Sequence, residues 1–285
     1  KNKLYLLVCS NDLDIIEISF YPIAEAEPLP MDYNPKDDDE DYIFESENKI
    51  SLRKLNNEIA KIRHYRDSWD AKLFDLNLSD KVFKSLVNAT ESNLNSLHRF
   101  YDLKRRSLGF DELHTYDLCL DITKDDKEYS IEDAQIILRD ALKPLGQDYL
   151  KHFTRIFDNR YVDYCQYKGK CSGAYSFSTI NHDSRILMSF NNDFDSISTI
   201  AHEGGHNVHH QYIRENNDPV YRSPASIVCE VASLTNECIL SDYMYNNGAT
   251  IEEKKKGLAN IMGVIVSNLF GAVREGKIEQ EMYIS

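Results

Sequence analysis

The sequence predicts a mainly helical fold with a small β element directly before one helix. Long segments place apolar residues three and four positions apart, which is the spacing of one face of an α-helix. Short apolar runs of strand length are few, and the clearest covers residues 184–190. That run leads into a helical segment that contains HEGGH at residues 202–206. The junction of this strand and this helix is therefore the candidate functional region.

The first part of the chain is expected to hold helices and one short strand. Residues 52–75 and 79–109 carry apolar residues at helical spacing. Ser79 suits the N-cap of the second segment, and Gly109 suits its C-terminal stop. Residues 114–122 alternate between apolar and polar side chains, which predicts a strand.

Two further helices are predicted before the glycine-rich segment at residues 168–179. Ser130 precedes an acidic first turn, which favours a helix N-terminus because the helix dipole is positive there, and residues 146–160 continue as another helix. Residues 168–179 are rich in glycine and small polar residues and predict a loop. The helix that carries HEGGH is expected to begin near Asp195 or Ser196.

Two more helices are expected over residues 224–246 and from Ile251 to the C-terminus. The start of the chain differs from this pattern. Residues 28–47 are acidic and contain three prolines, so they predict a loop or disordered linker. The sequence therefore divides into an atypical N-terminal segment with an acidic linker, residues 1–48, and a helical region, residues 49–285.

The composition narrows the classes of partner and compartment. The net charge is -14, whereas a surface that binds nucleic acid or an anionic membrane needs a basic face. No run of about 18 apolar residues is recognised, so no transmembrane helix is expected. The six cysteines form no C-x-x-C pair and indicate reduced thiols in a cytoplasmic protein. A disulfide framework is the less favoured alternative.

The HEGGH segment has the residue types and spacing of a metal site. His202 and His206 are four residues apart on the predicted helix and face the same side, so both imidazoles can reach one ion. Glu203 lies beside them, where a general base can take a proton from water. The alternative interpretation is a chance match to H-E-x-x-H in a helix of purely structural role. We interpret the segment as a zinc site with a built-in base.

A catalytic zinc site needs a third protein ligand and one open position. Glu230 follows His202 by 28 residues, about the length of a returning helix, and Glu237 lies on the same face seven residues later. One of the two is the candidate ligand, and the other could hold the N–H of a ligating imidazole. Either glutamate taken alone would be a solvated helix residue.

These segments together resemble the thimet oligopeptidase and oligoendopeptidase F family of zinc metallopeptidases, and the oligoendopeptidase F branch is the nearer match. The resemblance rests on H-E-x-G-H-x-x-H from His202 to His209 and on E-V-A-S-x-x-N-E from Glu230 to Glu237. Further similar segments lie upstream in the same order: residues 108–118, 168–176 and 185–203. The likeness extends over roughly residues 55–285.

The resemblance implies a helical zincin-type metallopeptidase core that binds one zinc ion per chain and cleaves short peptides. It implies that His202, His206 and Glu230 bind the metal and that Glu203 activates water. His209 and Glu237 would support the metal site. The implied substrate-binding residues are Gly169, Ser172, Gly173, Tyr175, Leu187 and Ser189. The strand at residues 186–190 would pair with the extended peptide backbone.

Two departures from the family pattern bear on activity. Gly204 stands where the family usually has a larger apolar residue, and a glycine inside a helix costs about 1 kcal/mol relative to alanine. The chain ends at Ser285, before the tyrosine- and histidine-rich stretch that stabilises the oxyanion in the family, and most of the family's N-terminal helical region is also missing. The sequence is therefore expected to be a truncated member. A catalytically silent relative that binds zinc and peptides stays open as the alternative function, and the oligomeric state is not predicted.

Overall fold

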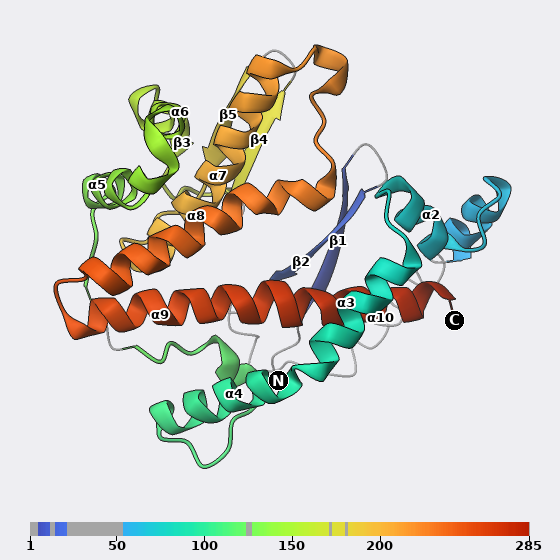
Figure 1. The fold of residues 1–285 in the computed structure, drawn as a ribbon, viewed down its shortest axis with the longest axis horizontal. Coiled ribbons are helices and arrows are strands. Elements are labelled where there is room, and N and C mark those ends of the chain that lie inside the picture. Colours follow the sequence, from blue (N-terminus) through green and yellow to red (C-terminus); the bar gives the residue numbers. More distant parts are fainter. Residues whose placement is uncertain are drawn as a thin grey trace. The chain divides into compact units, whose positions relative to one another are not determined.

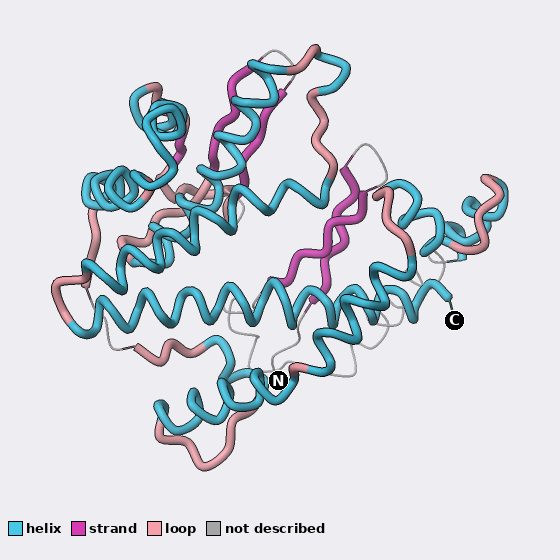
Figure 2. The backbone as a smooth tube through the Cα atoms, viewed as in Figure 1, coloured by secondary structure: helices cyan, strands magenta, loops and turns pink. Residues whose placement is uncertain are grey.

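The computed structural model describes residues 5–11, 15–21, 54–123, 127–170, 173–179 and 182–284. They belong to two compact units, of which the first comprises Lys1–Ser68 with Asp111–Leu120 and the second Trp69–Phe110 with Asp121–Ser285. Helices make up most of the described chain (Figures 1 and 2). The predicted class, mainly helical with a small β element beside the HEGGH helix, is confirmed.

The first unit contains a hairpin, a short helix and a 3-10 turn. Strands β1 (Tyr5–Asn11) and β2 (Ile15–Tyr21) pair antiparallel, with Tyr5 opposite Tyr21. A helix covers residues 54–62. Residues 114–122 do not form the predicted strand, because Thr115–Cys119 form a 3-10 helix, η1. Its start is fixed locally: the Asp117 carboxylate accepts the backbone N–H of His114 at 2.8 Å, a contact that alternating polarity does not reveal.

The second unit begins at Trp69, within α2 (Ser68–Asp75), and continues with α3 (Asp80–Ser92) and α4 (Leu94–Leu108). The Ser79 side chain caps α3 by accepting from the Val82 backbone N–H, as predicted. Gly109 ends α4 in the left-handed conformation, at φ +72°, also as predicted. The expected single helix over residues 79–109 is divided at Asn93. Trp69 packs edge to face on Phe83, with ring centroids 4.7 Å apart.

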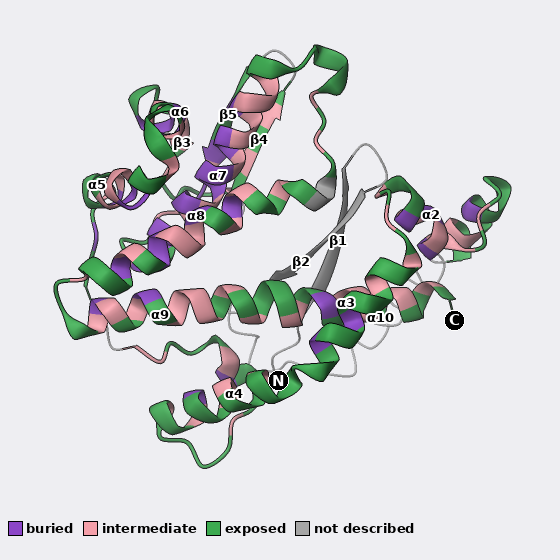
Figure 3. Cartoon of the chain, viewed as in Figure 1, coloured by how far each residue is buried: buried purple, intermediate pink, exposed green. Residues whose placement is uncertain are grey.

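The core of this unit lies where two amphipathic helices pack on the HEGGH helix. These are α5 (Ile131–Ala141) and α6 (Gly146–Asp158). Ser130 and Asp133 form a reciprocal capping box that starts α5 at the predicted place. The core residues with essentially no exposed surface include Leu138, Phe153, Ile156, Ile186, Ile197, Ile200 and Leu240. Figure 3 shows this buried band along α7 and β5.

A three-stranded sheet lies next to the HEGGH helix in the order β3-β5-β4. The strands are β3 (Val162–Asp163), β4 (Tyr175–Thr179) and β5 (His182–Leu187). β5 runs parallel to β3 and antiparallel to β4, with Ile186 opposite both Val162 and Ser176. The expected strand is present, but part of the expected loop over residues 168–179 is itself a strand, because Tyr175–Thr179 gain pairing partners that composition alone does not show.

Three long helices complete the unit. α7 (Phe194–Asn216) carries HEGGH and begins one residue before the predicted start, with the Asp193 carboxylate accepting from the Ser196 backbone N–H at 2.8 Å. α8 (Ser226–Asn247) packs against both α7 and α9 (Ile251–Ile265) (Figure 1). A π-helical turn, η4 (Val266–Gly271), then joins α9 to α10 (Ala272–Ile284).

The continuous helix Ile251–Ile284 departs from one expectation. By length and composition it could cross a membrane, although the sequence was expected to hold no such segment. Only 17% of its apolar window is buried within the described chain. Asn260 on this helix hydrogen-bonds to serine side chains of α7 and α8, so one face of the helix takes part in the packing of the unit.

Candidate metal centre

The structure brings together the three side chains that the sequence analysis named as metal ligands. His202 and His206 lie on α7 with their rings in an edge-to-face arrangement, 4.9 Å between centroids. The Glu230 Oε2 atom of α8 lies 3.4 Å from His202 Nε2 and 3.5 Å from His206 Nε2. One donor atom from each residue lies within 4.8 Å of the others. Two imidazole nitrogens and one carboxylate oxygen form a donor set that suits zinc.

A close crossing of two helices produces this convergence. A Cβ atom at Gly205 would lie 2.6 Å from the backbone oxygen of Ala232 and 2.7 Å from the Cα of Ser233. Only glycine therefore lets α7 approach α8 at this point. Glu230 lies one turn before Ser233, and Ser233 Oγ donates to its carboxylate at 2.6 Å. The crossing brings the Glu230 carboxylate over the two histidines, and the serine fixes its orientation.

Gly204 lies on the opposite side of α7, and close packing also requires a glycine there. A Cβ atom there would lie 2.4 Å from Cε2 of Phe153, whose side chain is fully buried in α6. The larger apolar residue that is usual at this position would collide with that ring. The loss of helix propensity at Gly204 is thus accompanied by close packing between α7 and α6.

Glu203 lies beside the donor set in a buried position. Burial raises the pKa of its carboxyl group, and the charges of His202 and His206 oppose that rise. The backbone N–H of Ser176 on β4 donates to the carboxylate. Ser176 is opposite Ile186, whose own N–H points away to the Tyr161 oxygen, so the N–H of Ser176 faces the outer edge of the sheet. β4 therefore lies directly against the candidate base.

Glu237 holds the far side of the His202 ring. Its Oε1 atom lies 2.6 Å from His202 Nδ1. Burial lowers the pKa of His202, but the hydrogen bond and charge of Glu237, with the charges of Glu203 and Glu230, outweigh it and raise the pKa above 6.5. The hydrogen bond to His206 is the main cause that lowers the pKa of Glu230 to about 2. Glu230 is thus an anion, and the imidazole orientation is fixed.

The other predicted supporting residue, His209, lies further along α7. Its ring stacks on His210 with centroids 6.3 Å apart, and burial lowers its pKa. Burial also lowers the pKa of His210 to about 4, and His210 Nδ1 lies 3.5 Å from Ser184 Oγ. The structure therefore places His209 against a neutral neighbour, and its supporting role stays a prediction.

The predicted substrate-binding residues are only partly brought together. Gly169 and Gly173 adopt φ of +90° and +92°, as glycines in a tight loop can, and Ser172 lies outside the described residues. Tyr175 begins β4 with an exposed side chain. Leu187 ends β5, and Ser189 follows it.

The expected pairing strand needs correction. Ile186 and Leu187 do not form an edge of the sheet, because β5, which ends at Leu187, lies between β3 and β4. Backbone N–H groups of Ile186, Met188 and Phe190 donate to residues 161–164. Within the described part of the sheet, the long strand with an unpaired edge is β4. The family resemblance indicated residues 186–190 as the pairing strand, but the apolar side chains of β5 belong to a strand that is flanked on both sides and therefore buried.

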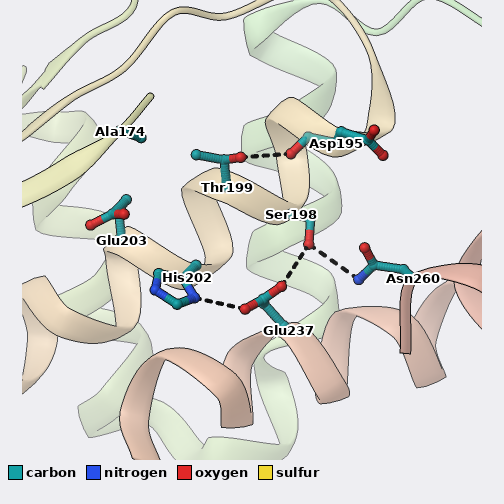
Figure 4. A pocket seen from close by; sticks show the side chains of 8 residues that line it. All are labelled: Ala174, Asp195, Ser198, Thr199, His202, Glu203, Glu237 and Asn260. Atoms are coloured by element: carbon teal, nitrogen blue, oxygen red, sulfur yellow. Dashed lines mark hydrogen bonds and ion pairs between the residues drawn. The ribbon is translucent and has the colours of Figure 1, made fainter. Parts of the chain in front are cut away.

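A pocket of about 310 Å³ opens beside His202 and Glu203 (Figure 4). Its lining comes mainly from the first turns of α7 and from α8 and α9. Besides the two residues named, the lining residues are Ala174, Asp195, Ser198, Thr199, Glu237 and Asn260. Ser198 and Asn260 are not among the predicted site residues, because small polar residues inside helices carry no local signal of a site.

Comparisons with known proteins show which family the chain is similar to. The sequence profile of Peptidase family M3 matches residues 34–270. The chain is 34% identical to Oligopeptidase PepF of Bacillus subtilis over 206 residues, which is 72% of this chain and 30% of that protein. It is 31% identical to the oligoendopeptidase F homolog of Borreliella burgdorferi over 201 residues, 70% of this chain and 34% of that protein.

Solved structures show the same likeness. A structure from Chlamydophila abortus matches 82% of this chain and 39% of its own, at 26% identity and a TM-score of 0.70. Oligoendopeptidase-F from Enterococcus faecium matches 81% of this chain and 33% of its own, at 25% identity and a TM-score of 0.53. The chain thus spans about a third of the length of these relatives. With the profile match covering most of its residues, the chain belongs to peptidase family M3.

Proposed function

We propose that this chain carries the zinc-binding catalytic centre of a metalloendopeptidase that hydrolyses peptide bonds in short oligopeptides. The observation that carries the proposal is the convergence of His202 Nε2, His206 Nε2 and Glu230 Oε2 next to the buried carboxylate of Glu203. Family membership and the names of the relatives support a peptidase. The donor set of two histidines and one glutamate fits a catalytic zinc ion that keeps one open position.

The protein side chains divide the chemical work. When bound, a zinc ion would polarise the scissile carbonyl and make water a stronger acid. Glu203 would remove a proton from the attacking water and transfer it to the leaving amine. Its raised pKa suits the first step, because a stronger base takes the proton from water more readily, and the protonated carboxyl group can still give that proton to the more basic leaving amine. Glu237 would keep the His202 ring aligned on the metal.

The outer edge of β4 would bind the peptide backbone. β4 pairs with β5 on its inner side, and its outer edge lies against Glu203. An extended peptide that adds to this edge would place a peptide bond near the candidate base, as in strand-addition recognition generally. The pocket beside His202 would then take a side chain next to the scissile bond.

Cleavage of an internally quenched peptide tests the function. The 285-residue chain is expected to cleave the peptide, to lose that activity when a zinc chelator is added, and to regain it with added zinc. Cleavage that persists with the chelator would contradict a metal mechanism.

The alternative function is a protein that binds zinc and peptides without turnover, and the same assay distinguishes it from a peptidase. Stoichiometric zinc and measurable peptide binding without cleavage would select this candidate over the peptidase.

A further inference from the structure

A network of hydrogen-bonded side chains lies behind the candidate metal centre and extends from His202 on α7 to Asn260 on α9. His202 Nδ1 contacts Glu237 Oε1 at 2.6 Å. Ser198 Oγ donates to the other carboxylate oxygen, Glu237 Oε2, at 3.2 Å. Asn260 Nδ2 on α9 donates to Ser198 Oγ at 3.1 Å. In Figure 4, His202 and Ser198 of α7 both contact Glu237 of α8, and Asn260 of α9 contacts Ser198.

The donors and acceptors in this network of side chains allow the hydrogen bonds to point in only one direction, from Asn260 through Ser198 to Glu237. The amide nitrogen of Asn260 has two hydrogens, and it donates one to Ser198 Oγ and the other to Ser241 Oγ, at 2.9 Å. Because Ser198 Oγ accepts from Asn260, its single hydrogen is directed to Glu237. Ser198 is 5% exposed and Ser241 2%, so water does not readily replace these partners.

The direction of these hydrogen bonds determines which nitrogen of the His202 imidazole carries the hydrogen. A carboxylate that is held by a hydrogen bond on Oε2 keeps Oε1 in place to accept a hydrogen bond from the N–H of His202 Nδ1. The Nε2 atom of His202 then presents its lone pair toward Glu230 and His206. The tautomer that can bind a metal is therefore set from outside the donor set.

We propose that Ser198 and Asn260 are positioning residues that hold Glu237, and through it His202, in the geometry that binds the metal. The inference rests on the proposed zinc site and goes beyond it, because it gives α9 a part in metal affinity although α9 supplies no ligand. Ser198 and Asn260 act in series: Asn260 orients the hydroxyl that Ser198 gives to Glu237.

Zinc dissociation constants, measured by competition with a chromophoric chelator, test this relay of hydrogen bonds from Asn260 through Ser198 to Glu237. The full chain is compared with Ser198→Ala, Asn260→Ala and the double variant. Loss of a partner that orients a ligand typically weakens metal binding about 10- to 100-fold, and we expect about tenfold for Ser198→Ala with a smaller loss for Asn260→Ala. The double variant is expected to match Ser198→Ala, because residues in series are not additive.

Thr199→Val provides the matched control. Thr199 is the next residue on α7 and lines the same pocket, but its hydroxyl donates to the Asp195 backbone oxygen and not to Glu237. Its substitution is expected to leave zinc affinity within about twofold, as for a change outside the network. Asn260→Asp, which keeps the side-chain shape and removes the donor, replaces Asn260→Ala if that variant does not melt cooperatively without zinc.

The outcomes separate this inference from the function on which it rests. A parent chain that binds no zinc removes both. A parent that binds zinc, with unchanged affinity in Ser198→Ala and Asn260→Asp, overturns the relay alone. Losses that multiply in the double variant would also overturn it, because independent packing effects multiply and serial ones do not.

Discussion

Gly205 of α7 and Ala232 of α8 lie so close that a Cβ atom on Gly205 would be 2.6 Å from the Ala232 backbone oxygen. This crossing determines where Glu230 meets the two histidines of α7. The metal centre therefore depends on a residue that has no side chain and takes no part in binding. The metal-binding arrangement of two histidines and a glutamate therefore also requires that the two helices approach each other closely at Gly205.

Gly205→Ala is expected to destabilise the folded chain by about 1–3 kcal/mol, because an added methyl group must push two packed backbones apart. It is also expected to weaken zinc binding by moving Glu230. Gly263→Ala is the matched control, since among the described residues no atom beyond the neighbouring backbone of its own helix lies within 4 Å of a Cβ there, and alanine favours a helix interior. Denaturant unfolding of both variants checks this, and an unchanged midpoint for Gly205→Ala would contradict the close crossing.

Gly204→Ala is expected to clash with the fully buried Phe153 ring and to cost about 1–3 kcal/mol. Because the obstacle is one side chain, the loss should be smaller when Phe153→Leu is already present. A double-mutant cycle measured by unfolding tests this coupling. Equal losses in both backgrounds would show that Phe153 is not the obstacle.

Glu203→Gln is expected to retain zinc and to lower peptide cleavage by about 100- to 10,000-fold, the usual contribution of a positioned general base. The amide keeps the size of the side chain and cannot take a proton from water. Zinc content and cleavage are measured on the same preparation. Cleavage equal to that of the parent would assign the base to another group.

Zinc binding is expected to weaken as pH falls, beginning above pH 6.5, because the raised pKa of His202 lets protons compete with the metal. Glu230, with a pKa of about 2, stays ionised over this range and adds nothing to the change. Glu237→Gln removes the main cause of the raised pKa, so the loss should move to lower pH. A loss that stays at the same pH in this variant would show that Glu237 does not control His202.

The metal-free chain is expected to respond to pH with the opposite sign. A folded-state pKa above the unfolded value stabilises the fold at pH below about 6.5, and this contribution disappears as pH rises through the folded-state pKa of His202. Unfolding free energies measured with chelator at several pH values check the sign. Stability from His202 that grew with rising pH would contradict the raised pKa.

The sequence was sufficient where local physics decides the structure. The caps at Ser79, Ser130 and Gly109 and the period of the long helices follow from neighbouring residues. The spacing of His202 and His206 predicted that they would face one side of a helix, while spacing alone left the third ligand open between Glu230 and Glu237; the family resemblance indicated Glu230, which the structure places beside both histidines.

Tertiary contacts decided the rest. Residues 168–179 contain a strand because β5 pairs with Tyr175–Thr179, although their composition is that of a loop. Leu55, Ile59 and Ile62 share a helical stripe, yet all three are exposed within the described structure. Asn260 is 58 residues from His202 along the chain, so no sequence pattern connects them. Only the packing of α9 on α8 places Asn260 in the network behind the metal centre.

The measurement that tests the central claim most directly is the zinc content of the 285-residue chain after dialysis against metal-free buffer. Elemental analysis is expected to find one zinc ion per chain for the parent and a clear loss for His206→Ala and Glu230→Ala. A parent without zinc, or a His206→Ala variant that keeps a full equivalent, would contradict the assignment of His202, His206 and Glu230 as the metal-binding residues.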